Sequence, residues 1–312
     1  MTSSPLRHIG FVTLPKHIGN GAFDHGAVHG ASGHVYVAHT ANDAVDVFDP
    51  VSGRHLFAIA GLRGVAGVLV SEESQLIITS NRAENTIGMF APGPDPRVRK
   101  VGVGVGPNGL AYDPGRRLIL AANVGDPSIA SSHTVTMVDV DAGAVRAQVA
   151  VAGRTRWAIY DPGTATFYVN IMDPPQIATI SAEEPDRIDR ILTVPAAGPH
   201  GLDVDLRTHR LFCACDAGTL VTLDARSGTV IGEHALSGVP DVIFFNRRNS
   251  HLYVAVGEPG VIDVFDTGRM QRLATIATEK GTHTLALAPA GDQLYAFCPE
   301  THRAAVYAIE GH

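Results

Sequence analysis

One phrase recurs seven times along the 312 residues of the chain. Each copy contains a glycine-rich turn, an apolar strand, a polar turn, a second apolar strand, a loop and a third strand that often ends near an aspartate. The first strands begin at positions that are 41, 42, 48, 44, 41 and 42 residues apart: His25, Ala66, Asn108, Arg156, His200, Asp241 and His283. Such a repeat means that the fold consists of equivalent units, each packed against its neighbours.

The second strands of the copies are almost continuously apolar, as in LILAA from Leu118 and LYVAV from Leu252. Strands of this kind are buried on both faces, so each unit lies between two others. A more variable fourth strand follows the third. A twisted four-stranded sheet repeated about every 40 residues is typical of a β-propeller blade. We therefore predict an all-β fold, a single seven-bladed β-propeller with four antiparallel strands per blade that spans residues 1–312.

The 33 Gly and 19 Pro residues agree with this prediction, because they disfavour long helices and favour turns. The last copy ends after its third strand near Glu310, so its blade lacks an outer strand. The segment RHIGFVTLP at residues 7–15 precedes the first copy and resembles such a strand. We predict that it completes the last blade by pairing with residues 305–310, which closes the ring and leaves no open sheet edge.

The stretch GPHGLDVDLRTHRLFCACDAGTLVTLDARSGTVIGEHALSGVPD resembles the YVTN-type repeat of YncE-like seven-bladed propellers, and the resemblance covers essentially the whole chain. YncE-like proteins are usually exported. More distant similarity to the 6-phosphogluconolactonases and the virginiamycin B lyases implies that a ring of this kind can also be a cytoplasmic enzyme. No catalytic motif of either family is matched residue by residue, so the resemblance predicts the fold and leaves the function open.

Charge and hydropathy argue against nucleic acid and membranes as partners. The 24 Lys and Arg residues against 31 Asp and Glu give a net charge of −7, so no basic surplus favours nucleic acid. No run approaches the roughly 18 apolar residues that span a bilayer, and the first residues lack the pattern of a secretory signal. We expect a cytoplasmic protein that binds neither membrane nor nucleic acid. Its three cysteines, Cys213, Cys215 and Cys298, are predicted to be buried thiols.

The loop that enters the first strand of a blade and the loop that leaves the second lie on one face of the ring. The first positions of the seven inner strands should therefore surround the mouth of the central channel. Five of these residues can ligate, protonate or hydrogen-bond, and a sixth, Arg156, can bind an anion. We interpret the mouth as a functional site. The alternative is a wet channel whose polar side chains bind only water.

Three of the first positions are histidines, and imidazoles that converge from separate strands are common metal ligands. We predict a divalent metal ion held by His25, His200 and His283, with His29 and His39 as further candidate ligands. His29 lies deeper along its strand, where a core histidine is the alternative. The equivalents of His39 in two other blades are cysteines, which we expect to be structural rather than ligands.

Asp241 and Arg156 are the candidate catalytic residues. Asp241 follows Pro240 and acts either as an acid/base or ligand group at the channel or as a cap of the preceding turn. Arg156 either clamps a substrate anion or stacks on Trp157. Asn108, Arg156 and Asn170 are the candidate substrate-binding residues. The loop at residues 123–133 is a candidate lid.

Two functional hypotheses follow from these residues. The first is a metal-dependent enzyme, a lactonase-like hydrolase or a lyase, that acts on a small polar or anionic substrate at the channel mouth. The second is a non-catalytic YVTN-type propeller that binds a ligand or a protein partner on the same face. Neither the substrate nor the oligomeric state follows from the sequence.

Overall fold

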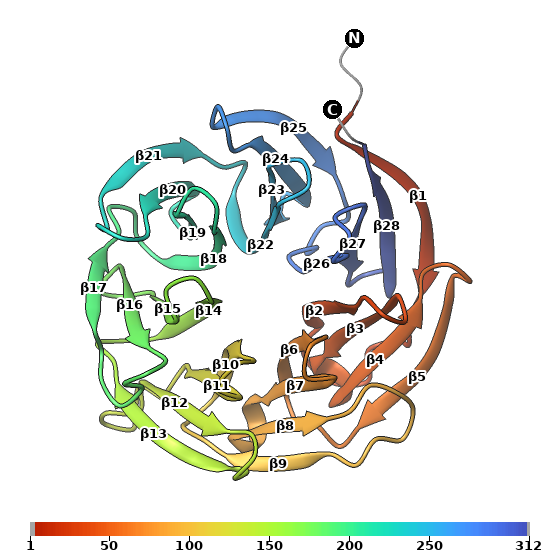
Figure 1. The fold of residues 1–312 in the computed structure, drawn as a ribbon. Helices are drawn as coiled ribbons and strands as arrows, with labels where there is room; N and C mark the ends of the chain where they lie inside the picture. Colours follow the sequence, from red (N-terminus) through yellow and green to blue (C-terminus); the bar gives the residue numbers. More distant parts are fainter. Residues whose placement is uncertain (1–3, 311–312) are drawn as a thin grey trace.

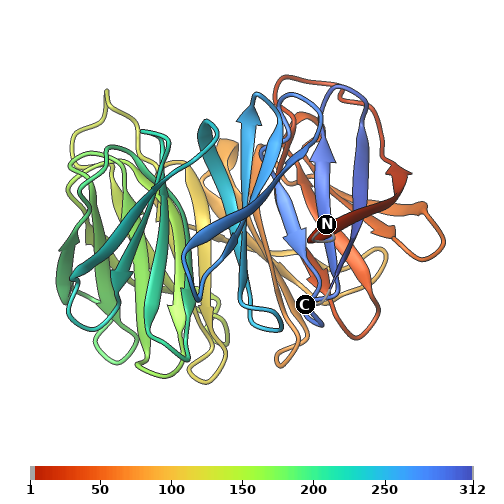
Figure 2. The same cartoon turned by 90° about the horizontal axis from the view of Figure 1, so that it is seen from above.

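The computed structural model describes residues 4–310, so the first three and last two residues of the predicted domain lie outside the described residues. Seven four-stranded antiparallel sheets surround a central channel (Figure 1). Figure 2 shows the ring from the side, with the loops gathered on its two faces. The chain is therefore a seven-bladed β-propeller, and the predicted fold is confirmed.

In six blades the strands lie in chain order from the channel outward, and in the last blade β26, β27 and β28 are followed by β1. The inner strands are β2 (Phe23–His29), β6 (Val65–Ser71), β10 (Pro107–Asp113), β14 (Thr155–Asp161), β18 (Pro199–Asp205), β22 (Val239–Asn246) and β26 (Leu285–Leu287). The second strands are β3 (His34–His39), β7 (Leu76–Asn81), β11 (Leu118–Asn123), β15 (Thr166–Ile171), β19 (Arg210–Cys215), β23 (His251–Glu258) and β27 (Gln293–Cys298).

The third and outer strands complete the blades. The third strands are β4 (Ala44–Asp49), β8 (Thr86–Phe90), β12 (Thr134–Asp139), β16 (Gln176–Ser181), β20 (Thr219–Asp224), β24 (Val261–Asp266) and β28 (Arg303–Ile309). The outer strands are β5 (Arg54–Ala60), β9 (Arg99–Gly102), β13 (Ala144–Ala150), β17 (Arg190–Thr193), β21 (Val230–Ala235), β25 (Gln271–Ala277) and β1 (Leu6–Thr13). Short 3₁₀ turns at Thr40–Asn42 and Arg82–Glu84 follow two of the second strands.

The outer strand of the last blade comes from the N-terminal part of the chain. β1 pairs antiparallel with β28, from Leu6 opposite Ile309 to Thr13 opposite Arg303. Figure 1 shows these segments side by side, at opposite ends of the colour scale. The predicted closure is confirmed, with the closing strand at residues 6–13. It stabilises the ring because the side chains of Leu6 and Val12 are buried there.

The core lies between the blades. All six residues of β11 are buried, as the apolar second strands predicted, whereas exposed and half-buried residues alternate along the outer strand β25. The three cysteines are buried and free of disulfides, also as predicted. Within residues 4–310, no helix is long and apolar enough to cross a membrane.

The inner strands change their pairing register with the second strands near the mouth of the channel. In β2, Phe23 pairs with His39 but Gly26 pairs with Val37, so three steps along β2 lie opposite two along β3. The registers of β6, β10, β14, β18 and β22 shift near the same place. A β-bulge of this kind brings two consecutive side chains to one place in the sheet and re-aims them, which is a common device next to binding sites.

Candidate functional site

The bulges define two layers of side chains at the mouth. The first layer, which we call the mouth ring, contains one residue from each blade: Asp24, Ala66, Asn108, Arg156, His200, Asp241 and His283. The second layer lies one residue deeper: His25, Gly67, Gly109, Trp157, Gly201, Val242 and Thr284. The sequence predicted six of the seven mouth-ring positions.

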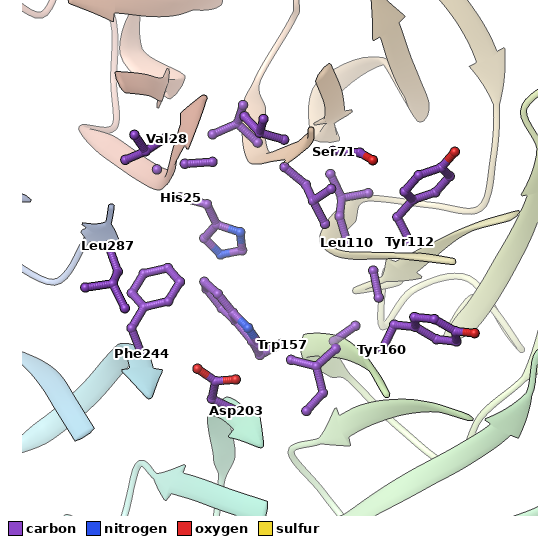
Figure 3. A pocket seen from close by; sticks show the side chains of 18 of the residues that line it. His25, Val28, Ser71, Leu110, Tyr112, Trp157, Tyr160, Asp203, Phe244 and Leu287 are labelled. Atoms are coloured by element: carbon purple, nitrogen blue, oxygen red, sulfur yellow. The ribbon is translucent and has the colours of Figure 1, made fainter. Parts of the chain in front are cut away.

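The exception is His25, which was expected to be equivalent to His200. Phe23 and Pro199 hold the same place in the sheet ladder, so Asp24 is the equivalent of His200 and His25 lies one residue deeper. There its ring packs against that of Trp157, with 4.1 Å between the ring centroids (Figure 3). Burial lowers the pKa of His25, against the opposing effect of Asp24. The expected alignment is wrong because it matched the His-Gly pair of each strand, and the two pairs lie one residue apart relative to the sheet ladder.

His200 lies between two carboxylates. Its Nδ1 is 2.7 Å from an Asp216 oxygen, and its Nε2 is 3.1 Å from an Asp241 oxygen. Burial alone would lower the pKa of His200, but the two carboxylates outweigh it and raise the pKa to about 9. Both ring nitrogens therefore carry a proton at neutral pH, and His200 is an imidazolium ion.

Asp241 is held in its charged form by the same contact. Burial would raise the pKa of this carboxyl, but His200, followed by His283 and His25, lowers it below its ordinary range. The carboxylate thus faces the histidines at the channel, where the sequence predicted either an acid/base or ligand role or a turn cap.

Arg156 adds a second cation next to His200. Its Nη1 is 3.2 Å from His200 Nε2, and its Nη2 is 3.4 Å from an Asp216 oxygen. Because the guanidinium and the imidazolium are both donors, the contact between them is not a hydrogen bond. The Nε atom of Arg156 is buried and has no partner among the described residues. Two cations thus lie side by side at the mouth, each next to a carboxylate, with one guanidinium donor left without a partner among the described residues.

Arg82 and Arg154 add further positive charge at the mouth. The Arg82 guanidinium donates to Asn108 Oδ1 at 2.6 Å and lies 3.5 Å from an Asp24 oxygen. Arg154 is exposed, and partial desolvation together with the charges of Arg156 and Arg82 lowers its pKa. Three guanidinium groups therefore act on one another at the mouth.

Asp24, Arg82 and Asp216 were not among the residues predicted from the sequence. Arg82 and Asp216 come directly after the second strands β7 and β19, where the chain returns to the mouth. Arg82 and Asp216 could therefore have been predicted by examining the residue that follows each second strand. Asp24 was missed because His25, one residue later in the chain, was aligned with His200.

His283 is oriented by its own loop. Its Nδ1 lies 2.7 Å from the carbonyl oxygen of Gly281 and must donate to it, because a carbonyl only accepts. In the neutral ring the lone pair is then on Nε2, which has no hydrogen-bond partner within residues 4–310. The mouth ring thus contains the His283 Nε2 atom, which has no partner among the described residues, as well as the protonated His200.

The remaining predicted residues lie away from the mouth ring. Asn170 is buried, and its amide donates to the carbonyl oxygens of His200 and Gly201, so it holds the bulge of the next blade. His29 lies at the other end of β2, 2.8 Å from the Ser32 hydroxyl. His39 is fully buried, and its Nδ1 is 2.6 Å from an Asp46 oxygen. The predicted roles of these residues in binding substrate or metal remain untested.

The predicted metal ligands do not form a recognisable cluster. No group of three or more His, Cys, Asp or Glu side chains in the described part of the chain is arranged to hold a metal ion. Both nitrogens of His200 face carboxylates. A protonated imidazole has no lone pair for a metal, so coordination would first require loss of the Nε2 proton. The metal ion remains a hypothesis.

Comparison with known proteins identifies the fold alone. No family model matches the chain, and no curated protein matches it. The chain is similar in structure to hydrazine synthase of Kuenenia stuttgartiensis, with a TM-score of 0.82 over 95% of this chain and 99% of that one, at 12% identity. As many as 1790 chains of solved structures match, so the similarity selects a widespread fold. Membership of the YncE-like family stays a prediction.

Proposed function

We propose that the protein is an enzyme that binds a small organic anion at the mouth ring and transfers protons to and from it through His200 and His283. The observation that carries the proposal is the contact of Arg156 with an imidazolium that is itself held between Asp216 and Asp241. Cations fixed in place before the ligand arrives stabilise an anion without reorganising. The exposed Arg154 beside them is available to meet a carboxylate as it enters.

The two histidines supply the two halves of a proton transfer. His283 Nε2 is the base, since its Nδ1 proton is held by Gly281, and His200 is the acid. In an elimination, His283 takes the proton next to the bound carboxylate while His200 gives one to the leaving group. One C–H and one C–X bond break and one C=C bond forms. In the hydrolysis of a lactone, His283 instead takes a proton from water, and the water oxygen bonds to the carbonyl carbon. The ring C–O bond breaks, and His200 gives its proton to the leaving oxygen. The proposal therefore covers lyase and hydrolase chemistry.

This proposal revises the metal-dependent form of the hypothesis. A site that contains one group to give a proton and another to take one is a common arrangement for acid and base catalysis. On the repeat pattern we also propose a YncE-like relationship. The predicted cytoplasmic location remains a prediction.

The test is a screen of the purified chain against small lactones and hydroxy-acid anions, with acid release and unsaturated products as readouts. We expect turnover that His200→Gln and His283→Gln each reduce by about 100-fold or more, as removal of one acid or base does. His234→Gln, on the outer strand β21, is the matched control and should leave turnover unchanged.

Two other outcomes would replace the proposal. If anions bind through Arg156 but none is turned over, the non-catalytic alternative is correct. If Zn²⁺ or Mn²⁺ binds stoichiometrically at neutral pH, and both histidine variants lose it together with activity, the metal-dependent form is correct instead.

A further inference from the structure

A hollow lies in the channel beyond the mouth ring. Its volume is about 460 Å³, within the range of about 300–1,000 Å³ that small-molecule sites occupy. The layer of His25 and Trp157 borders it on the side of the mouth. It extends to Pro114 and Arg247, which follow the ends of β10 and β22. We call this hollow the channel chamber; it shares no residue with the mouth ring.

The walls of the channel chamber are mostly apolar. Figure 3 shows Trp157, Phe244, Leu287 and Leu110 around the open space, with Tyr112 and Tyr160 farther along one wall. The rings of Trp157 and Phe244 meet edge to face, with centroids 6.4 Å apart. Both side chains are only partly buried although they lie inside the ring. Aromatic surface left exposed in a hollow favours a ligand with an apolar body.

A carboxylate stands among these side chains. Asp203 belongs to β18, and Figure 3 shows its carboxylate beside Trp157 and Phe244. Its two oxygens accept the backbone N–H groups of Val204 and Phe245, both at 2.7 Å, which fixes its orientation. No ion pair neutralises Asp203 within residues 4–310. Burial raises its pKa to about 6, so it is mostly ionised at neutral pH.

A positive charge, that of Arg247, lies at the open end of the channel chamber. Arg247 lines the channel chamber and is exposed, and its side chain has no ion pair or hydrogen bond within the described residues. It is near enough for its charge to lower the pKa of Asp203, but the two do not form a salt bridge. A carboxylate and a guanidinium that face one hollow without pairing leave both charges for a ligand.

We propose that the channel chamber is a second ligand site, which takes a small zwitterion with an aromatic or bulky apolar body. The ligand's ammonium group binds Asp203, its carboxylate binds Arg247, and its apolar body packs against Trp157 and Phe244. A cation on Asp203 also lies close to aromatic rings, which attract positive charge. This inference is independent of the proposed function, because it uses different residues.

Trp157 makes the proposal directly testable, because it is the only tryptophan of the chain and its fluorescence reports on the channel chamber. The probes are L-phenylalanine, 2-phenylethylamine, which lacks the carboxylate, and 3-phenylpropionate, which lacks the amine. We expect saturable fluorescence changes with L-phenylalanine bound about 10-fold or more tighter than either analogue, since each charged contact adds to affinity.

Variants of Arg247 and Asp203 test the contribution of each charge to binding separately. Arg247→Ala should weaken L-phenylalanine by about 10-fold or more and leave 2-phenylethylamine unchanged. Asp203→Asn should weaken L-phenylalanine similarly and leave 3-phenylpropionate unchanged. Arg248→Ala is the matched control, since it removes the neighbouring exposed charge outside the channel chamber and should leave the affinity for all three probes unchanged.

Three results would each overturn the proposal: absence of saturable binding by L-phenylalanine, equal affinity for all three probes, or unchanged affinity for L-phenylalanine in Arg247→Ala. The last variant changes an exposed side chain, so it also decides the matter if Asp203→Asn fails to fold.

Discussion

The Nε2 atom of His200 lies 3.1 Å from a carboxylate oxygen of Asp241, which joins the inner strands of two neighbouring blades through a partly buried ion pair. Asp216 holds the other nitrogen at 2.7 Å. The His200 imidazolium therefore links two neighbouring blades and also belongs to the mouth ring. Its charge state should influence both stability and ligand binding.

The first prediction concerns stability against pH. The pKa of His200 is raised from 6.5 to about 9 on folding, so its contribution to stability is complete below pH 6.5 and is lost as pH rises through about 9. The loss should be about 3 kcal/mol in the free energy of unfolding. Urea denaturation at a series of pH values measures it. His200→Gln is the comparison, and an equally steep decline in that variant would refute the assignment.

The second prediction concerns activity against pH. If His200 is the acid, kcat/KM should fall as pH rises above about 9. Asp241→Asn removes one of the two carboxylates that raise this pKa, so the alkaline limb should move down by about one to three pH units. A pH–rate profile of both proteins checks the shift. An alkaline limb at the same pH in the variant would remove His200 from the role of acid.

The third prediction concerns anion binding at the mouth ring. Arg156→Ala should weaken a bound carboxylate by about 2 kcal/mol, or roughly 30-fold in Kd, because it removes a partly buried cation. Calorimetric titration with the anion found in the screen gives the number. Arg146→Ala, on the exposed face of β13, keeps the same change in net charge and should bind normally. Equal losses in the two variants would indicate only a general effect of charge.

The fourth prediction concerns closure of the ring. Val12 of β1 is 1% exposed, whereas Ile9 of the same strand is 44% exposed. Val12→Ala should therefore lower the free energy of unfolding by about 2 kcal/mol, and Ile9→Ala by much less. Deletion of residues 1–15 should lower the thermal midpoint markedly. A truncated chain with an unchanged midpoint would show that β1 does not hold the ring together.

The fifth prediction concerns the close approach of neighbouring blades at the bulges. A Cβ atom on Gly201 would lie 2.2 Å from the backbone oxygen of Asp241, which leaves no room for a methyl group. Gly201→Ala should therefore destabilise the fold by about 1–3 kcal/mol, and because it displaces the backbone of Asp241 it should also weaken anion binding. Gly102→Ala, with no atom within 4 Å of its added Cβ, is the control for both measurements.

The sequence by itself determined the number of blades, the buried second strands and the closing strand. These features depend on hydrophobic alternation and a period of about 40 residues, which are local patterns that every copy repeats. It also located His200, Asp241 and His283 in the mouth ring, because a repeat aims equivalent residues at the same axis.

Only the tertiary structure decided which side chains meet. Phe23 pairs with His39 as Pro199 pairs with Cys215, so Asp24 takes the place where His25 was expected, and His25 packs against Trp157. The pairing of His200 with Asp241 across two blades changes a candidate metal ligand into an imidazolium. The channel chamber is a further product of the closed ring, since its walls come from strands far apart in the chain. Such contacts depend on distances between blades, and no repeat pattern in the sequence encodes those distances.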